Sequence, residues 1–155
     1  RDDPLTKPTM IVELKDLKGL TRPQCDRLAY FVLDCVQTYA SAQPGVSALT
    51  EFFSNETGTL MEGCSYGELD ASTKRIPRHV MGTAANVMRA VDPGSPDFLH
   101  AYAVHMLADY VLCGEPDVLV EAVTALIESQ DDEQLRTILT FSLKRQVSLL
   151  KRDAA

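Results

Sequence analysis

This sequence of 155 residues lacks long apolar runs, paired cysteines, catalytic signatures and, over two long stretches, any positive charge. Charged residues interrupt the apolar runs well before the roughly 20 residues that a bilayer-crossing helix needs, so we expect no membrane association. Apolar residues make up 45% of the chain, which is enough for a folded core and excludes a disordered protein.

The four cysteines are scattered along the chain and form no CxxC pair. They are Cys25, Cys35, Cys64 and Cys113. Cys25 and Cys35 are separated by about 15 Å along one expected helix, which is too far for a disulfide bond. A chain of this length can form a core without disulfides, so the cysteine pattern favours a reducing, intracellular setting. Because the chain begins at Arg1 rather than Met, we expect it to be a part or a processed form of a longer protein.

No sequence signature of catalysis or cofactor binding occurs in the chain. The patterns GxxxxGK[ST], GxGxxG, GxSxG and HExxH are all absent, which excludes the corresponding nucleotide, hydrolase and zinc-protease motifs. Gly58, Gly63 and Gly67 have no preceding strand and no following Lys-Ser/Thr, so they do not form a phosphate-binding loop. We therefore expect no catalytic residue and no cofactor, and a non-enzymatic protein is favoured over an enzyme.

Two histidines lie close together in sequence but do not predict a metal site. His100 and His105 are separated by about 140° around a helix, so they do not share a face as metal ligands at i, i+4 would. Asp97 with His100 and His105 with Asp109 are better spaced, but the chain has no Glu-x-x-His of the kind that di-iron bundles use. We expect helix-surface hydrogen bonds or ion pairs here, and no bound metal.

Apolar residues recur at three- and four-residue spacing after Thr21, which is the period of amphipathic helices. Helices are expected over residues 10–18, 21–43, 44–58, 76–92 and 96–113, from residue 116 through residue 127, and from residue 131 to the C-terminal region. Residues 59–75 contain two glycines and are expected to be a broken helix or an ordered loop. The last helix carries an apolar stripe of Leu135, Ile138, Leu139, Leu143, Val147 and Leu150.

Capping residues mark several of these helix ends. Thr21 and Ser95 are expected N-caps, and Gly114 is expected to provide a left-handed C-terminal residue. Pro116 is suited to the first turn of the following helix. The last helix is expected to begin at Asp131, with Gln134 as its capping-box partner.

Short connections between helices favour antiparallel neighbours. The sequence therefore predicts an all-α fold, an antiparallel helical bundle or short helical stack of about six to seven helices. Residues 1–8 are expected to be a flexible tail and residues 9–155 a single helical domain. No fixed internal repeat is present, which argues against a regular repeat family.

Charge is segregated along the chain, which has a net charge of −7. Residues 28–73 and 90–135 contain no Lys or Arg. The second block carries ten acids: Asp92, Asp97, Asp109, Glu115, Asp117, Glu121, Glu128, Asp131, Asp132 and Glu133. One interpretation is a solvated surface whose acids pair with Arg136, Lys144 and Arg145 of the last helix. The other is an acidic face that recruits a basic partner.

These features favour a protein–protein interaction domain that acts as an adaptor, a scaffold or a self-association module. The partner is expected to be another protein with a basic surface or a second copy of the chain. The contact positions expected from their place off the apolar stripes are Asp109, Asp117, Glu121 and Glu128. One alternative is a helical enzyme or ligand-binding bundle whose site is assembled from distant residues. Another is nucleic-acid binding through the basic last helix, although the acidic body argues against it.

Overall fold

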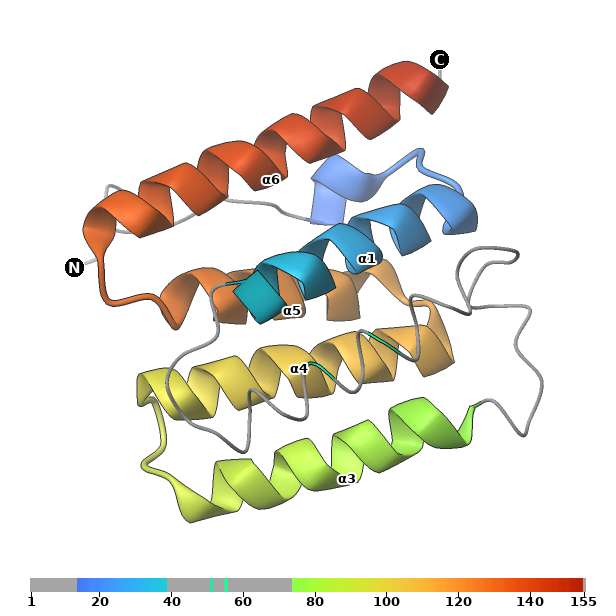
Figure 1. Cartoon of the computed structure of the whole chain (residues 1–155). Helices are drawn as coiled ribbons and strands as arrows, with labels where there is room; N and C mark the ends of the chain where they lie inside the picture. Colours follow the sequence, from blue (N-terminus) through green and yellow to red (C-terminus); the bar gives the residue numbers. More distant parts are fainter. Residues whose placement is uncertain (1–13, 39–50, 52–54, 56–73, 155) are drawn as a thin grey trace.

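The computed structural model describes residues 14–38, 51, 55 and 74–154 (Figure 1). The elements in this part of the chain are all helical: the 3-10 helix η2 (Leu14–Leu17) and the α-helices α1 (Arg22–Thr38), α3 (Arg75–Ala90), α4 (Pro96–Cys113), α5 (Pro116–Glu128) and α6 (Glu133–Ala154). No strand occurs among these residues. The all-α prediction is confirmed.

The expected number of six to seven helices is not matched, because the described residues hold five α-helices. The helix expected over residues 10–18 is a single 3-10 turn in its described portion, and Gly19 follows it with a φ of 94°. Of the helix expected over residues 44–58, only Glu51 and Asn55 are described, and both are helical. The expected tail, residues 1–8, and the expected loop up to residue 73 lie outside the described residues.

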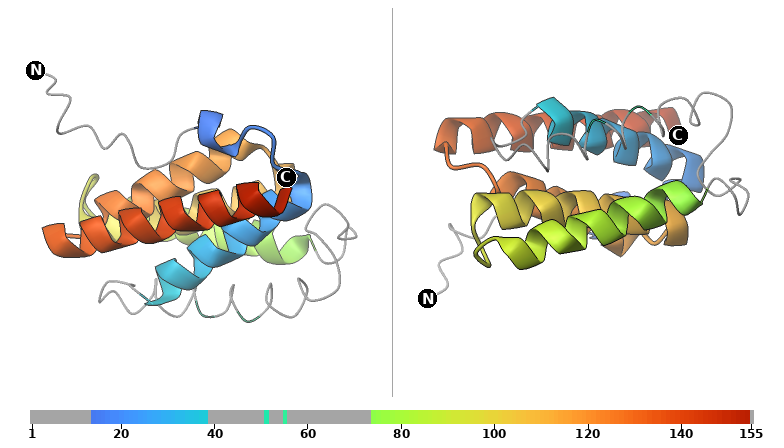
Figure 2. Two further views of the ribbon diagram at one scale, coloured as in Figure 1. Left: turned by 90° about the horizontal axis from the view of Figure 1, so that it is seen from above. Right: turned by 60° about the horizontal axis from the view of Figure 1, so that its bottom comes forward.

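Helices that follow one another from α3 to α6 run in alternating directions, and α1 runs in the same direction as α5 (Figure 1). α4 packs against α3 on one side and α5 on the other, while α1 packs against α4, α5 and α6. α6 and α3 lie on opposite sides of the molecule, as the views in Figure 2 also show. Central α4 is therefore covered by several helices, whereas α6 lies at the edge and is covered on one side.

Local chemistry sets the helix ends largely as the sequence predicts. Thr21 and Gln24 form a reciprocal capping pair: Thr21 N donates to Gln24 Oε1 at 2.8 Å, and Gln24 N donates to Thr21 Oγ1 at 3.3 Å. Ser95 Oγ accepts from Phe98 N, and Gly114 closes α4 with a φ of 72°. The predicted start of the last helix at Asp131 is wrong. Asp132 provides the cap by accepting from Gln134 N at 2.9 Å, so α6 begins at Glu133.

One apolar cluster forms the core between these helices. Three positions in the middle of predicted stripes are buried: Leu107, Val123 and Leu139 are 2%, 0% and 1% exposed. The prediction that Ile138 is a core residue is wrong, because its side chain is 55% exposed. Since α6 lies at the edge of the fold, its buried stripe is narrow and consists of Leu139, Leu143, Val147 and Leu150.

Candidate functional site

A hollow of about 250 Å³ lies between α4 and α5 and opens to solvent. We call it the acidic hollow, and it is lined by Leu99, Tyr102, Glu121, Thr124, Ala125 and Glu128. The four residues from α5 share one side of that helix, because Glu121, Thr124 or Ala125, and Glu128 follow one another at spacings of three or four. Leu99 and Ala125 give it apolar walls, while two carboxylates give it negative charge.

Tyr102 and Glu121 connect the two helices across the hollow. The Tyr102 hydroxyl donates a hydrogen bond of 2.8 Å to Glu121 Oε1. Burial raises the pKa of Tyr102 to about 12, and the hydrogen bond and the charge of Glu121 act in the same direction. The Phe98 ring stacks on Tyr102 with 6.5 Å between centroids and 8° between planes. Tyr102 is therefore a neutral donor at physiological pH that orients the Glu121 carboxylate.

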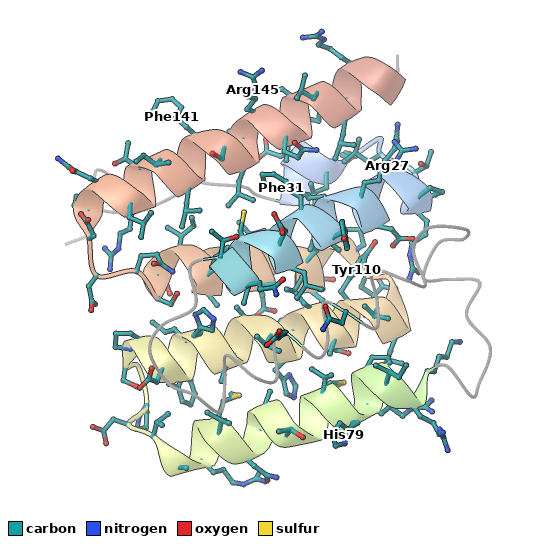
Figure 3. All side chains as sticks on the ribbon, viewed as in Figure 1. Arg27, Phe31, His79, Tyr110, Phe141 and Arg145 are labelled. Carbon is teal, nitrogen blue, oxygen red and sulfur yellow. The ribbon has the colours of Figure 1, made fainter. Side chains whose placement is uncertain are left out.

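Glu128 is exposed at the other end of the same α5 face, and no described cation forms an ion pair with it or with Glu121. Arg136 instead donates through Nε to the Gln130 carbonyl at 2.6 Å, and its Nη1 lies 3.8 Å from Glu133 Oε1. Arg145 is exposed on the side of α6 that is turned away from α5 (Figure 3). The cations of α6 therefore leave both glutamates of the hollow unneutralised.

Of the four contact positions predicted from sequence, the structure brings only Glu121 and Glu128 into one hollow. Asp109 is half-buried on α4 and does not line it. Asp117 lies in the first turn of α5, where its own Oδ1 accepts from Val118 N at 3.0 Å. Sequence reasoning missed Tyr102, although its i, i+4 spacing from Phe98 is the spacing of an aromatic pair on one helix face.

The interpretation of His100 as a surface residue is wrong, because its side chain is 0% exposed. Among the described residues, neither ring nitrogen of His100 has a hydrogen-bond partner, and Nδ1 of His105 has none either. Burial lowers the pKa of His100, and the charge of Asp97 opposes that shift. The cause is the central position of α4, whose sides are covered by neighbouring helices. No group of three or more His, Cys, Asp and Glu side chains in the described ranges is placed to hold a metal ion.

A second polar cluster is buried where α1 meets α4. Asp26 is 1% exposed and accepts hydrogen bonds of 2.8 Å from Arg22 Nε and from the Tyr110 hydroxyl. Arg22 also lies over the Tyr110 ring, 5.2 Å from its centroid, and Nη2 donates to the Val111 carbonyl at 3.5 Å. Burial raises the pKa of Tyr110, with further contributions from Asp26. Strongly shifted pKa values often mark functional sites, but Asp26 and Tyr110 are buried against each other and Arg22 is only partly exposed, so we assign the cluster a structural role.

Two cysteines of α1 are buried: Cys25, next to Asp26, and Cys35, ten residues further along the helix. Burial raises the pKa of Cys25, and the charge of Asp26 adds to the shift. Burial and the charge of Asp34 raise the pKa of Cys35 to about 11. Because the thiolate is the reactive form, the raised pKa values disfavour a nucleophilic role for both thiols.

The chain matches no known family model, no curated protein and no solved structure. Among its described helices, none combines the length and apolar character needed to cross a bilayer. The geometry of the acidic hollow is therefore the strongest indication of function in the described residues.

Proposed function

We propose that this is a non-enzymatic interaction domain, an adaptor, scaffold or self-association module of the cell interior, that binds a basic segment of a partner protein in the acidic hollow. The observation that supports it is the pair Glu121 and Glu128 beside apolar walls, with no described cation pairing with either carboxylate. Exposed ion pairs contribute only about 0–1 kcal/mol to stability, so fold stability is a weak reason to gather acids there.

The chemistry of the hollow suits recognition of a cation. Carboxylates accept short, charge-assisted hydrogen bonds from Arg and Lys, and Tyr102 already fixes one oxygen of Glu121. The apolar walls formed by Leu99 and Ala125 offer contact to an aliphatic stem or a ring. A volume of about 250 Å³ falls below the roughly 300–1,000 Å³ of small-molecule pockets, which favours insertion of one or two side chains of a partner over a free small ligand.

The same residues offer little for catalysis. The lining contains no His, Cys or Ser, and the Thr124 hydroxyl donates to the Val120 carbonyl at 3.0 Å rather than to a carboxylate that could activate it. Tyr102, with a pKa of about 12, stays protonated near neutral pH and is a poor general base. An enzyme whose site draws on distant residues remains the alternative proposal, and it predicts turnover that does not depend on the hollow.

Nucleic-acid binding through α6 is a second candidate because α6 exposes Lys144 and Arg145 about one turn after Phe141, which is 71% exposed, and Lys151 and Arg152 almost two turns further on. An aromatic ring among cations can stack on an unpaired base. The net charge of −7 opposes this function. Titration with a labelled single-stranded oligonucleotide tests it, and binding that is lost in Phe141→Ser would support it.

A peptide library displayed on phage tests the proposed function. We expect selection on the parent protein to enrich peptides that combine Arg or Lys with an apolar residue. A synthetic copy of a selected peptide should lose binding to Glu121→Lys/Glu128→Lys. The matched control, Asp34→Lys/Asp131→Lys, changes net charge equally at exposed acids outside the hollow and should bind normally. Enrichment of no basic peptide, or equal binding by both variants, would refute the proposal.

A further inference from the structure

The outward side of α6 carries a continuous exposed stripe. It consists of Gln134, Ile138, Phe141, Arg145, Ser148 and Arg152. These residues follow one another at alternating spacings of four and three, so they form one helix face. We call this face the outer stripe of α6. It lies opposite the buried stripe that holds α6 to the core.

The outer stripe combines large apolar side chains with cations. Ile138 and Phe141 are 55% and 71% exposed, and Arg145 follows one turn after Phe141. Figure 3 shows Phe141 and Arg145 on the side of α6 that is turned away from α1 and α5. Aromatic residues, Phe among them, and Arg are enriched in protein interfaces relative to the rest of the surface.

This stripe complements the acidic hollow in charge and in spacing. Phe141 and Arg145 are one helical turn apart, about 6 Å along the axis. Thr124, midway along the α5 side of the hollow, and Glu128 have the same separation of four residues. A helix docked parallel to α5, with its phenyl ring in the hollow beside Thr124, would bring an arginine one turn away to Glu128.

The two surfaces do not meet within one chain, because the outer stripe faces away from α5 and no described cation pairs with Glu128. We infer that the basic partner is a second copy of this chain, whose Phe141 and Arg145 dock into the acidic hollow. This inference rests on the proposed function of the hollow. The contact joins two different surfaces, so it either closes reciprocally into a dimer or continues into a larger ring or chain.

Sedimentation velocity of the parent protein from about 1 µM to about 1 mM tests self-association. We expect the mean mass to rise with concentration. We also expect weaker association at about 0.15 M salt than at about 0.01 M, because the Debye length shrinks from about 30 Å to about 8 Å. A single-chain mass across the whole range would overturn the inference.

Two variants identify the surfaces involved. Phe141→Ser removes the anchor, and Glu128→Arg places a like charge opposite Arg145. Both positions are exposed, so the fold should be spared. We expect each to weaken self-association by about 30-fold or more, as loss of an interface hot spot does. The matched control Tyr30→Ser removes an aromatic side chain that is 42% exposed on α1, and it should associate like the parent.

Mixing the two variants gives the sharpest test. Phe141→Ser keeps an intact hollow and Glu128→Arg keeps an intact outer stripe, so the mixture should form a 1:1 pair that goes no further. A different pattern would overturn the inference: Phe141→Ser weakens association, Glu128→Arg leaves it unchanged, and the mixture forms no pair. That pattern would indicate contact between two outer stripes. A parent protein that stays monomeric but binds the selected basic peptide would overturn the second-copy partner alone. A parent protein that neither self-associates nor binds a basic peptide would refute the proposed function as well.

Discussion

Replacing Asp26 by Ala should strongly destabilise the protein, because this carboxylate organises the contact between α1 and α4. It is 1% exposed and accepts hydrogen bonds of 2.8 Å from both Arg22 and Tyr110. Without it, the hydroxyl of Tyr110, a residue that is 0% exposed, loses a buried acceptor. Arg22 at the same time loses its counter-charge.

The expected loss of unfolding free energy is about 3 kcal/mol. Removing one partner of a buried ion pair typically costs about 3–5 kcal/mol. The lower end applies because the Arg22 side chain is 30% exposed, so water still solvates part of its charge. Tyr110→Phe removes one hydrogen bond to a charged acceptor and should cost about 1.5–3 kcal/mol. Against a total stability of roughly 5–15 kcal/mol, both losses are readily measured.

Urea unfolding followed by circular dichroism measures these losses. The double variant Asp26→Ala/Tyr110→Phe should lose less than the sum of the single variants, because the two residues share one hydrogen bond. Asp34→Ala, at an exposed acid on the same helix, serves as control and should stay within about 0.5 kcal/mol of the parent. A loss below about 1 kcal/mol for Asp26→Ala, or full additivity, would contradict the argument.

Further predictions concern the core, a turn and a buried histidine. Leu107→Ala should cost roughly 2–5 kcal/mol in urea unfolding, whereas Ile138→Ala should cost little; equal effects would contradict the assigned faces. Gly114→Ala should cost at least about 1–2 kcal/mol, because its φ is 72° and a Cβ there would overlap the Arg22 guanidinium. Gly82→Ala, with open space around it in α3, should instead stabilise by roughly 0.5–1 kcal/mol. Because burial lowers the pKa of His100, its contribution to stability should be complete above its ordinary value of 6.5 and fall as the pH drops below it. His100→Leu should flatten that pH dependence in unfolding measured from pH 7 to pH 5, and an unchanged slope would show that the ring does not resist protonation. We also expect no stoichiometric metal, and elemental analysis near one zinc or iron per chain would contradict this.

The sequence predicts best what depends on neighbouring residues. Ser95, Gly114 and Pro116 mark helix ends because capping and left-handed conformations are local properties of the chain. Helical period likewise identifies Leu107, Val123 and Leu139 as core residues before any helix is placed. The error at the start of the last helix is also local. Asp131 is the predicted start, but the adjacent Asp132 has the same carboxylate and caps the helix instead.

Sequence period cannot show which helix is central and which is at the edge. His100 is buried because α4 is covered on several sides, and Ile138 is exposed because α6 is covered on one. The nearly uncharged sequence of α4 was a usable signal, because a helix that is apolar all round is expected to be buried. The bond between Tyr110 and Asp26 spans 84 residues and depends on the packing of α1 against α4, which no local pattern encodes.

The acidic hollow can be predicted from the sequence only in part. Glu121 and Glu128 are seven residues apart, so helical geometry alone places them on one face, about 10.5 Å apart along the axis. The hollow between them exists because α4 contributes Leu99 and Tyr102, and the Tyr102 hydroxyl fixes one of the two carboxylates.

Tyr102→Phe should leave the fold intact, since this hydrogen bond is exposed and its loss costs about 1 kcal/mol or less. It should weaken binding of the selected basic peptide by less than Glu121→Lys/Glu128→Lys does, because it frees the Glu121 carboxylate without removing its charge. Fluorescence polarisation of the labelled peptide measures this difference. Equal losses in the two proteins would mean that the hydroxyl itself, rather than the charge of the hollow, binds the peptide.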